Sequence, residues 1–317
     1  MTDFKTLGEV FRKYESFAIF SHANADGDTI GASLGLGLSL KKIGKRVFYV
    51  VPEPVPEKFV FLKDYELINN DIGFLCEAEV GVLVDAAMTS RVEGLEERLR
   101  TFKITVNIDH HPGNGRFATY NYVDGSAPST TSILLRFFEQ EGFPIDPDIS
   151  DAFFTGLMTD TGSFHYSNAT AEAFEVGRKL VEYGARPDYI GRMIYEQETL
   201  PHLKLLGLAL TRLNVEQGIA YSYITAEDFV QCKALEEDTE GIVDYMQKLR
   251  ESNVVVFFKE RPNDIKVSLR GKGKVDVKRI AEKFGGGGHV LAAGCTIRMP
   301  LASAIREIID SIKEGEK

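Results

Sequence analysis

The sequence predicts an α/β protein: an N-terminal domain with a mainly parallel sheet flanked by helices, then a smaller α/β domain. Short apolar runs alternate with helical patterns in the first half of the chain, which is typical of βαβ units. Three of these runs end directly in Asp or in a loop rich in Asp and His. The length of 317 residues exceeds the size at which one hydrophobic core usually stops growing, so two domains are expected.

The first half of the chain is expected to alternate between helices and buried strands. Apolar runs of four to six residues indicate the strands, and apolar spacing of three to four residues indicates the helices. The expected strands are 17–20, 46–51, 80–84 and 103–108. The expected helices are 3–14, 29–43, 149–158 and one that starts at a cap on Ser129 or Thr130 and ends near 140.

The second half begins with a long helical region. Residues 169–213 are amphipathic with helical spacing and contain no strand pattern, so they are interpreted as the end of the first domain and a helical connector. The expected strands beyond it are 220–224, 254–258 and 265–269, and the expected helices are 239–250, 275–284 and 301–313. The expected domains are residues 1–190, a helical linker at 191–213 and residues 214–317.

Composition narrows the class of protein. The net charge of −10 argues against binding of long duplex nucleic acid, which needs many phosphate contacts from Lys and Arg. No apolar run reaches membrane-spanning length, and residues 1–5 lack the features of a secretory signal, so a cytoplasmic protein without membrane contact is expected. The widely spaced Cys76, Cys232 and Cys295 are interpreted as reduced and mostly buried thiols.

Polar residues that can bind metal follow the expected strands. Because the carboxyl ends of parallel strands lie at one edge of a sheet, these side chains are expected to converge. Taken singly each has an ordinary structural reading: a pair of histidines in a loop or core, or a carboxylate in a turn at a helix end. Taken together they predict a metal site. The candidates are His22, Asp26, Asp28, Asp85, Asp109, His110, His111 and Asp160.

The size and chemistry of this set predict the reaction. Six ligands, counted without Asp109 and His111, are more than one divalent ion needs, so two ions that share a carboxylate are expected. Two such ions are typical of phosphate ester hydrolysis. Four carboxylates, two imidazoles and no thiolate favour Mn²⁺, with Mg²⁺ or Co²⁺ as possible substitutes.

A basic segment in the second domain is a candidate phosphate-binding surface. Residues 259–283 contain nine Lys or Arg and four Asp or Glu, although a solvated charged face is the usual explanation for such a run. Arg270 leaves an expected strand ahead of a glycine-containing turn, where a guanidinium can bind phosphate oxygens. Gly285 to His289 can present backbone N–H groups to an anion, or can be a flexible connector.

These motifs resemble, in order, those of the DHH phosphoesterase superfamily. The resemblance is carried by His22-x-Asn24-x-Asp26-x-Asp28, Asp85, Asp109-His110-His111 and Thr159-Asp160-Thr161-Gly162. Ser268-Leu269-Arg270 and Gly285 to His289 resemble the DHHA1 domain, and the length is similar to that of the NrnA-like branch. This resemblance implies Mn²⁺-dependent cleavage of short oligoribonucleotides, of pApA or cyclic di-AMP, or removal of phosphate from pAp.

The resemblance also implies roles for individual residues. One ion would be bound by His22, Asp26 and Asp85, and the other by Asp28, Asp85, His110 and Asp160. The catalytic residues would be Asp85, as the bridge, His111 at the scissile phosphate and Asp109 behind it. Substrate would be bound by Asn24, Ser268, Arg270, Gly286, Gly287, Gly288 and His289.

Two departures and two alternative functions accompany the resemblance. Ala25 stands where many relatives have Pro, and His165 stands where many have Arg, so His165 is interpreted as a turn residue or a substrate contact. A pyrophosphatase-like hydrolase shares the first-domain motifs, and a non-catalytic nucleotide-binding sensor belongs to a different class. A homodimer is expected from the resemblance and from the apolar helical region after residue 169.

Overall fold

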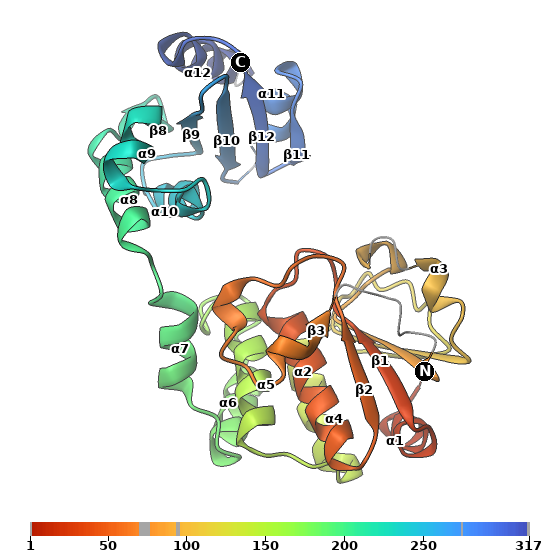
Figure 1. Cartoon of the computed structure of the whole chain (residues 1–317). Coiled ribbons are helices and arrows are strands. Elements are labelled where there is room, and N and C mark those ends of the chain that lie inside the picture. Colours follow the sequence, from red (N-terminus) through yellow and green to blue (C-terminus); the bar gives the residue numbers. More distant parts are fainter. Residues whose placement is uncertain (1, 70–76, 93–95, 274, 316–317) are drawn as a thin grey trace. The chain divides into compact units, whose positions relative to one another are not determined.

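The chain forms two compact units, which divide between Gln197 and Glu198. The computed structural model describes residues 2–69, 77–92, 96–273 and 275–315 (Figure 1). Cys232 and Cys295 are buried and unpaired, as expected, whereas Cys76 lies outside the described residues. Among the described helices, none is long and apolar enough to cross a membrane.

The first unit contains a six-stranded sheet in which every neighbouring pair of strands is parallel. In spatial order its strands are β3 (Ile68–Asn69), β2 (Arg46–Val50), β1 (Ser16–Phe20), β4 (Val80–Val84), β5 (Ile104–Asp109) and β6 (Tyr120–Val123). The order of the strands reverses between β1 and β4. In parallel sheets, a crevice opens beyond the carboxyl ends of the strands at such a switch point.

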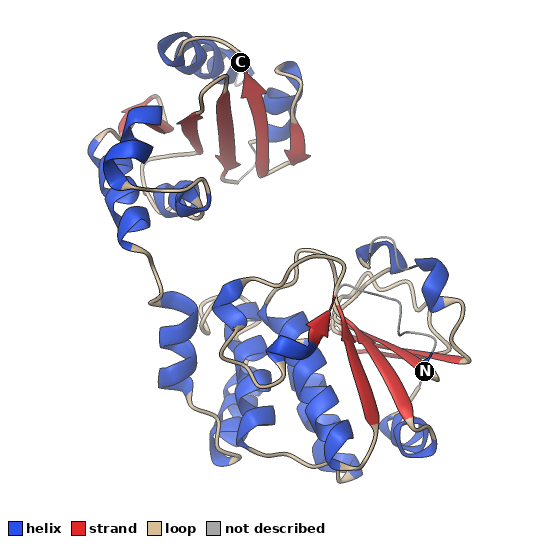
Figure 2. Cartoon of the chain, in the orientation of Figure 1, coloured by secondary structure: helices blue, strands red, loops and turns tan. Residues whose placement is uncertain are grey.

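Helices cover both faces of this sheet (Figure 2). On one face, α2 packs against β1, β2 and β4, and its other side packs against α4 and α5. The opposite face is covered by a smaller apolar cluster that includes Phe20, Leu83 and Leu99. The helices of the first unit are α1 (Phe4–Lys13), α2 (Gly27–Lys42), α3 (Glu96–Leu99), α4 (Thr130–Glu141), α5 (Pro147–Asp160), α6 (Ala171–Glu182) and α7 (Pro187–Tyr195).

The second unit contains a mixed six-stranded sheet between two layers of helices. Its strands in spatial order are β11 (Gly287–His289), β12 (Ala292–Ile297), β10 (Ile265–Gly271), β9 (Val254–Glu260), β8 (Ile219–Ile224) and β7 (Asn214–Glu216). Only β8 and β9 pair in parallel among these described strands. Its helices are α8 (Leu200–Thr211), α9 (Ala226–Cys232), α10 (Ile242–Met246), α11 (Val277–Lys283) and α12 (Leu301–Gly315).

Several segments differ from the sequence-based expectation, and the short elements β3, β6, β7, β12, α3 and α9 were not expected at all. The helix expected at 239–250 is only α10, because Gly241 has a left-handed backbone (φ 76°) that starts the helix late. Within 191–213, α7 belongs to the first unit, and α8 contributes Leu205 and Ala209 to a core of the second unit. The glycine segment forms the edge strand β11 and pairs with β12.

Glycines allow α2 and α5 to pack unusually closely. A Cβ atom on Gly31 would lie 2.2 Å from the carbonyl oxygen of Ala152, and one on Gly35 would lie 2.3 Å from the ring of Phe153. The backbone oxygen cannot move aside without displacement of α5. The sequence Gly27 to Lys42 therefore uses small residues as a packing surface, and nearly the whole of α2 is buried.

We expect Gly31→Ala to lower the free energy of unfolding by about 2 kcal/mol, because the added methyl group overlaps the α5 backbone. Gly191→Ala is the matched control. Gly191 is also inside a helix, but a Cβ there meets no atom within 4 Å, so about 0.5 kcal/mol of stabilisation is expected. Urea unfolding of both variants measures the difference, and equal effects would contradict the packing argument.

Candidate metal centre

The structure brings the six predicted metal ligands together at the carboxyl edge of the first sheet. His22 follows β1, Asp85 follows β4 and His110 follows β5, so three strands deliver one ligand each. Two helices deliver the others. Asp26 caps α2, Asp28 lies in its first turn, and Asp160 is the last residue of α5.

His22, Asp26 and Asp85 form one group whose potential ligand atoms lie within 4.8 Å of one another. His22 Nε2 is 3.4 Å from Asp85 Oδ2 and 3.8 Å from Asp26 Oδ1. His22 Nδ1 is 2.7 Å from the carbonyl oxygen of Ala23, which orients the ring and leaves Nε2 toward the carboxylates. His22 is 1% exposed, and its Nε2 has no hydrogen-bond partner.

Asp28, His110 and Asp160 form a second group with the same spacing. His110 Nε2 is 3.7 Å from Asp160 Oδ2 and 4.0 Å from Asp28 Oδ2. Asp85 also reaches this group, because its Oδ1 is 3.5 Å from His110 Nε2. One carboxylate of Asp85 therefore touches both groups, with a different oxygen toward each.

The charge of the cluster favours a divalent cation. Burial raises the pKa of Asp85 well above its ordinary value, and the carboxylates of Asp28 and Asp26 raise it further. Burial likewise raises the pKa of Asp160 to about 6. Among the described residues, the ion pairs of these four carboxylates are all with histidines and none is with Lys or Arg.

His22 also suits metal binding. Burial lowers the pKa of His22, which favours the neutral imidazole that binds metals. Its buried and unpartnered Nε2 is the kind of atom that a cation would satisfy. The residues present therefore fit a pair of divalent ions with mixed nitrogen and oxygen ligands.

His111 lies beside the two groups and is held by Asp109. His111 Nδ1 is 2.7 Å from Asp109 Oδ1 and 3.6 Å from Asp85 Oδ1. The hydrogen bond to Asp109 raises the pKa of His111 to about 9. Burial alone would raise the pKa of Asp109, but hydrogen bonds from His111 and Asn114 lower it below its ordinary value. The pair is thus a buried carboxylate that stabilises a half-exposed imidazolium.

The amino end of α4 supports the cluster, a contribution that sequence reasoning missed. The backbone N–H groups of Thr130 and Thr131 donate to Asp28 Oδ2 and Oδ1 at 2.6 and 3.0 Å. The hydroxyl groups of Thr131 and Thr130 donate to Asp28 and Asp85 at 2.9 and 3.0 Å. The signal was the hydroxyl-rich run Ser129 to Ser132, which was used only to predict a helix cap.

Two further residues considered in the sequence analysis, Asn24 and His165, are exposed and form hydrogen bonds through their backbone N–H groups. Asn24 is exposed and has a left-handed backbone (φ 54°), and its N–H donates to Glu53 Oε2 at 2.9 Å. His165 is exposed in the turn after α5, where its N–H donates to the carbonyl oxygen of Thr161 at 2.9 Å. This hydrogen bond supports the interpretation of His165 as a turn residue.

The predicted residues of the second unit lie on neighbouring strands. Pairing places Ser268 opposite Gly294 and Arg270 opposite Ala292, and Gly287 and His289 pair with the same two residues from the other side. A Cβ atom on Gly286 would lie 2.1 Å from the carbonyl oxygen of Gly294, so only glycine allows this approach. The motif residues thus come from β10 and β11, with β12 between them.

A pocket of about 420 Å³ in the second unit contains part of this motif. Lys259, Lys266, Ser268 and Arg270 line it from β9 and β10. Arg270 Nε is 2.7 Å from Asp244 Oδ1, and Lys259 Nζ is 2.8 Å from Glu236 Oε1. Lys266 also lines this pocket, and it forms no ion pair with any described residue.

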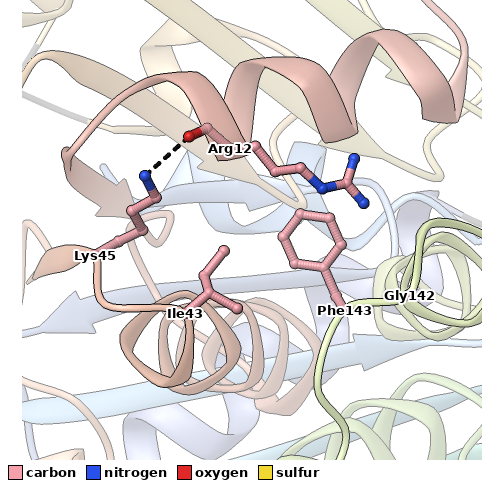
Figure 3. Close-up of a pocket in the computed structure, with 5 residues that line it drawn as sticks. All are labelled: Arg12, Ile43, Lys45, Gly142 and Phe143. Carbon is pink, nitrogen blue, oxygen red and sulfur yellow. Dashed lines mark hydrogen bonds between the residues drawn. The ribbon is translucent and has the colours of Figure 1, made fainter.

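Another pocket, of about 300 Å³, lies away from the metal ligands (Figure 3). It is lined by Ile43 and Lys45, beyond the carboxyl end of α2, whereas the ligands surround the amino end about 24 Å away along the helix. Both of its cations are occupied: Lys45 Nζ binds Glu15 and the carbonyl oxygen of Arg12, and Arg12 binds Glu141. We therefore interpret this pocket as part of the packing between helices and not as a binding site.

Comparisons with known proteins agree with this architecture. Residues 16–157 match the N-terminal domain model of the DHH family, and residues 217–315 match the DHHA1 domain. The chain is 31% identical to a bifunctional oligoribonuclease and PAP phosphatase NrnA of Thermus thermophilus, over 98% of this chain and 93% of that protein. A protein of the same name from Bacillus subtilis is 25% identical over 90% of each chain.

A solved structure also resembles the whole chain. An exopolyphosphatase-related protein from Bacteroides fragilis superposes with a TM-score of 0.84 and 25% sequence identity, over 98% of this chain and 95% of that one. Both domain types thus occur in the expected order, and the sequence similarity extends over nearly the full length. The chain therefore belongs to the DHH family of phosphoesterases and carries a C-terminal DHHA1 domain.

Proposed function

We propose that this phosphoesterase is a Mn²⁺-dependent phosphodiesterase. It hydrolyses short oligoribonucleotides and dinucleotides such as pApA to mononucleotides, acts on cyclic di-AMP, and removes the 3′-phosphate of pAp. The observation that carries this proposal is the position of Asp85 between two groups of metal ligands. The name of the Thermus relative, an oligoribonuclease and PAP phosphatase, supports the choice of substrates.

Two ions per chain are proposed. His22, Asp26 and Asp85 hold one, and Asp28, Asp85, His110 and Asp160 hold the other. Mixed carboxylate and imidazole ligands without thiolate favour Mn²⁺, and Mg²⁺ or Co²⁺ are proposed as substitutes. Such ions lower the pKa of water and neutralise negative charge on phosphate oxygens.

The residues around the ions orient and stabilise the reacting phosphate. Asp109 accepts the Nδ1 hydrogen of His111, which leaves Nε2 as the ring nitrogen available to substrate. A protonated His111 places positive charge where a phosphate oxygen gains negative charge, or donates a proton to the leaving oxygen. The amino end of α4 fixes Asp28 and Asp85 through Thr130 and Thr131, so the ligands are held in place before substrate binds.

The second unit is proposed to bind the end of the substrate away from the scissile bond. Ser268, Arg270 and the segment Gly286 to His289 are the proposed contacts of the second unit, and Asn24 is a separate proposed contact of the first unit. Arg270 is already oriented by Asp244, and Lys266 lines the same pocket without a carboxylate partner among the described residues. A terminal phosphate is the ligand that suits this pair of cations.

We expect Arg270→Ala to raise KM for pApA about 10-fold or more, because a hydrogen bond to a charged group contributes about 1.5–3 kcal/mol. The value of kcat should change less, since the metal ligands are intact. Arg298→Ala is the control: Arg298 is exposed in the same unit but does not line the pocket. Steady-state kinetics measure both, and an unchanged KM in Arg270→Ala would remove Arg270 from the substrate site.

A substrate panel tests the proposed reaction and separates it from its alternatives. The panel contains pAp, pApA, cyclic di-AMP, RNA of two to five nucleotides, pyrophosphate and inorganic polyphosphate, each with Mn²⁺. Mononucleotides from the short RNAs or dinucleotides are the expected products. Faster release of inorganic phosphate from pyrophosphate or polyphosphate would favour a pyrophosphatase-like hydrolase, and nucleotides that bind but are recovered unchanged would favour a sensor.

A cytoplasmic homodimer is the proposed working form. Exposed apolar side chains on the helices after residue 169, among them Phe174, Leu200 and Leu203, support self-association. Sedimentation of the full chain at several concentrations tests the dimer.

A further inference from the structure

Asn114 connects three separate parts of the polypeptide beside the candidate metal centre. Its side-chain Nδ2 lies 2.6 Å from Asp109 Oδ2, 2.7 Å from Asn107 Oδ1 and 3.1 Å from the carbonyl oxygen of Ala86, so its two hydrogens are shared among three acceptors. Its Oδ1 accepts the backbone N–H of Arg116 at 2.7 Å. One amide therefore joins the end of β5, the segment after Asp85 and the loop that follows His111.

The surroundings allow only one orientation of this amide. Three acceptor oxygens face Nδ2 and one donor faces Oδ1, so a flipped amide would oppose oxygen to oxygen and N–H to N–H. Asn107 is completely buried and its own Nδ2 donates to the carbonyl oxygen of Ala86 at 3.1 Å. The same Nδ2 of Asn107 also lies 3.4 Å from the carbonyl oxygen of Leu83, so the network links Asp109 to the segment on both sides of Asp85.

Asp109 needs such a partner because it is completely buried. Its Oδ1 accepts from His111, and Asn114 supplies the hydrogen bond to Oδ2. Without Asn114, a buried carboxylate oxygen would lose a short charge-assisted hydrogen bond, and the carboxylate could rotate away from His111. His111 is 42% exposed, and beside Asp109 its ring has an edge contact with His110, with 4.8 Å between the ring centroids.

We propose that Asn114 is a positioning residue for His111, acting through Asp109. This inference rests on the proposed role of His111 at the scissile phosphate. Among the described residues, the side chain of Asn114 makes no hydrogen bond to a predicted metal ligand. Its loss should therefore change the chemical step and leave metal binding and substrate affinity in place.

Asn114→Ala is expected to lower kcat 10- to 100-fold on pApA, with KM within about twofold and Mn²⁺ content unchanged. Asn114→Asp has nearly the same shape but cannot donate to Asp109, so at least the same loss is expected. Asn121→Ala is the matched control. Asn121 is also partly buried and its Nδ2 donates to the carbonyl oxygen of Ala118 at 2.6 Å, but in the described part of the chain it makes no hydrogen bond to Asp109, so kcat should stay within twofold.

A double-mutant cycle separates positioning from general destabilisation. In a His111→Ala background, Asn114→Ala should lower kcat no further, because its effect passes through His111. An equal loss in both backgrounds, or loss of bound Mn²⁺, would overturn the proposal.

A second measurement does not depend on activity. The hydrogen-bonded Nδ1 proton of His111 should give a low-field NMR resonance, identified by its absence in His111→Ala. This resonance should be lost in Asn114→Ala and retained in Asn121→Ala. Its persistence in Asn114→Ala would contradict the proposal. If the wild-type chain turned over no phosphodiester, the proposed function would fail, while the resonance would still decide whether Asn114 positions His111.

Discussion

Asp85→Asn is expected to lower kcat/KM for pApA at least about 1,000-fold, which corresponds to about 4 kcal/mol of transition-state stabilisation. Asn keeps the shape of the side chain but removes the charge and one oxygen acceptor. Asp85 approaches His22 with one oxygen and His110 with the other, so both groups of ligands lose a member at once. Kinetics with Mn²⁺, together with the metal content of the purified variant, measure the effect.

The thermal stability of Asp85→Asn should rise although its activity falls. Removing one of four crowded carboxylates relieves repulsion, so Tm of the metal-free protein should rise. Asp151→Asn is the control, because Asp151 is a buried carboxylate that pairs with Arg186 and is not in the metal cluster. That variant should lose stability and keep its kcat/KM. Substantial activity in Asp85→Asn would exclude Asp85 as the shared ligand.

Removal of divalent ions should abolish turnover, and Mn²⁺ should restore it. Calorimetric titration of the chelator-treated chain is expected to give two ions per chain. Each bound ion should also stabilise the fold, by about 2.7 kcal/mol at a free concentration 100 times its Kd. The effect on Tm is therefore concentration-dependent.

His22→Ala tests how the ions are divided between the two groups. Among the described residues, the carboxylates paired with His22 are those of Asp26 and Asp85, so loss of the imidazole should leave one ion, in the group of Asp28, His110 and Asp160. Lys13→Ala is the control. Lys13 is exposed and is not a predicted ligand, so this variant should retain two ions. A single ion in the wild-type chain, or two in His22→Ala, would contradict the two-group arrangement.

The parts of the site that could be predicted are those set by local pattern and by topology. The runs Ser16–Phe20, Val80–Val84 and Ile104–Asp109 are five or six residues long and rich in β-branched or aromatic residues, so their identity as strands follows from length and composition. Parallel strands share a carboxyl edge, which brings His22, Asp85 and His110 together without any knowledge of side-chain contacts.

The parts that could not be predicted depend on contacts between distant segments. Thr130 and Thr131 reach Asp28 across more than one hundred residues, and no local pattern encodes that hydrogen bond. β11 was not predicted because glycine is unfavourable in strands, and here the close approach to β12 decides the conformation. Asn114 was overlooked because a polar residue next to Gly113 reads simply as a turn.

The close packing of α2 on α5 has a consequence for cation selectivity. Asp28 lies on α2 and Asp160 on α5, and a Cβ atom on Gly27 would lie 2.3 Å from Thr159 Oγ1, beside both ligands. A Cβ atom on Gly156 would likewise lie 2.6 Å from Asp28 Oδ1. We therefore expect the separation of the two helices to limit the ionic radius that the proposed ligands Asp28 and Asp160 can accommodate. We expect substitutions at these glycines to change which divalent ion is bound, because the added side chain would displace Asp28 or the residue before Asp160.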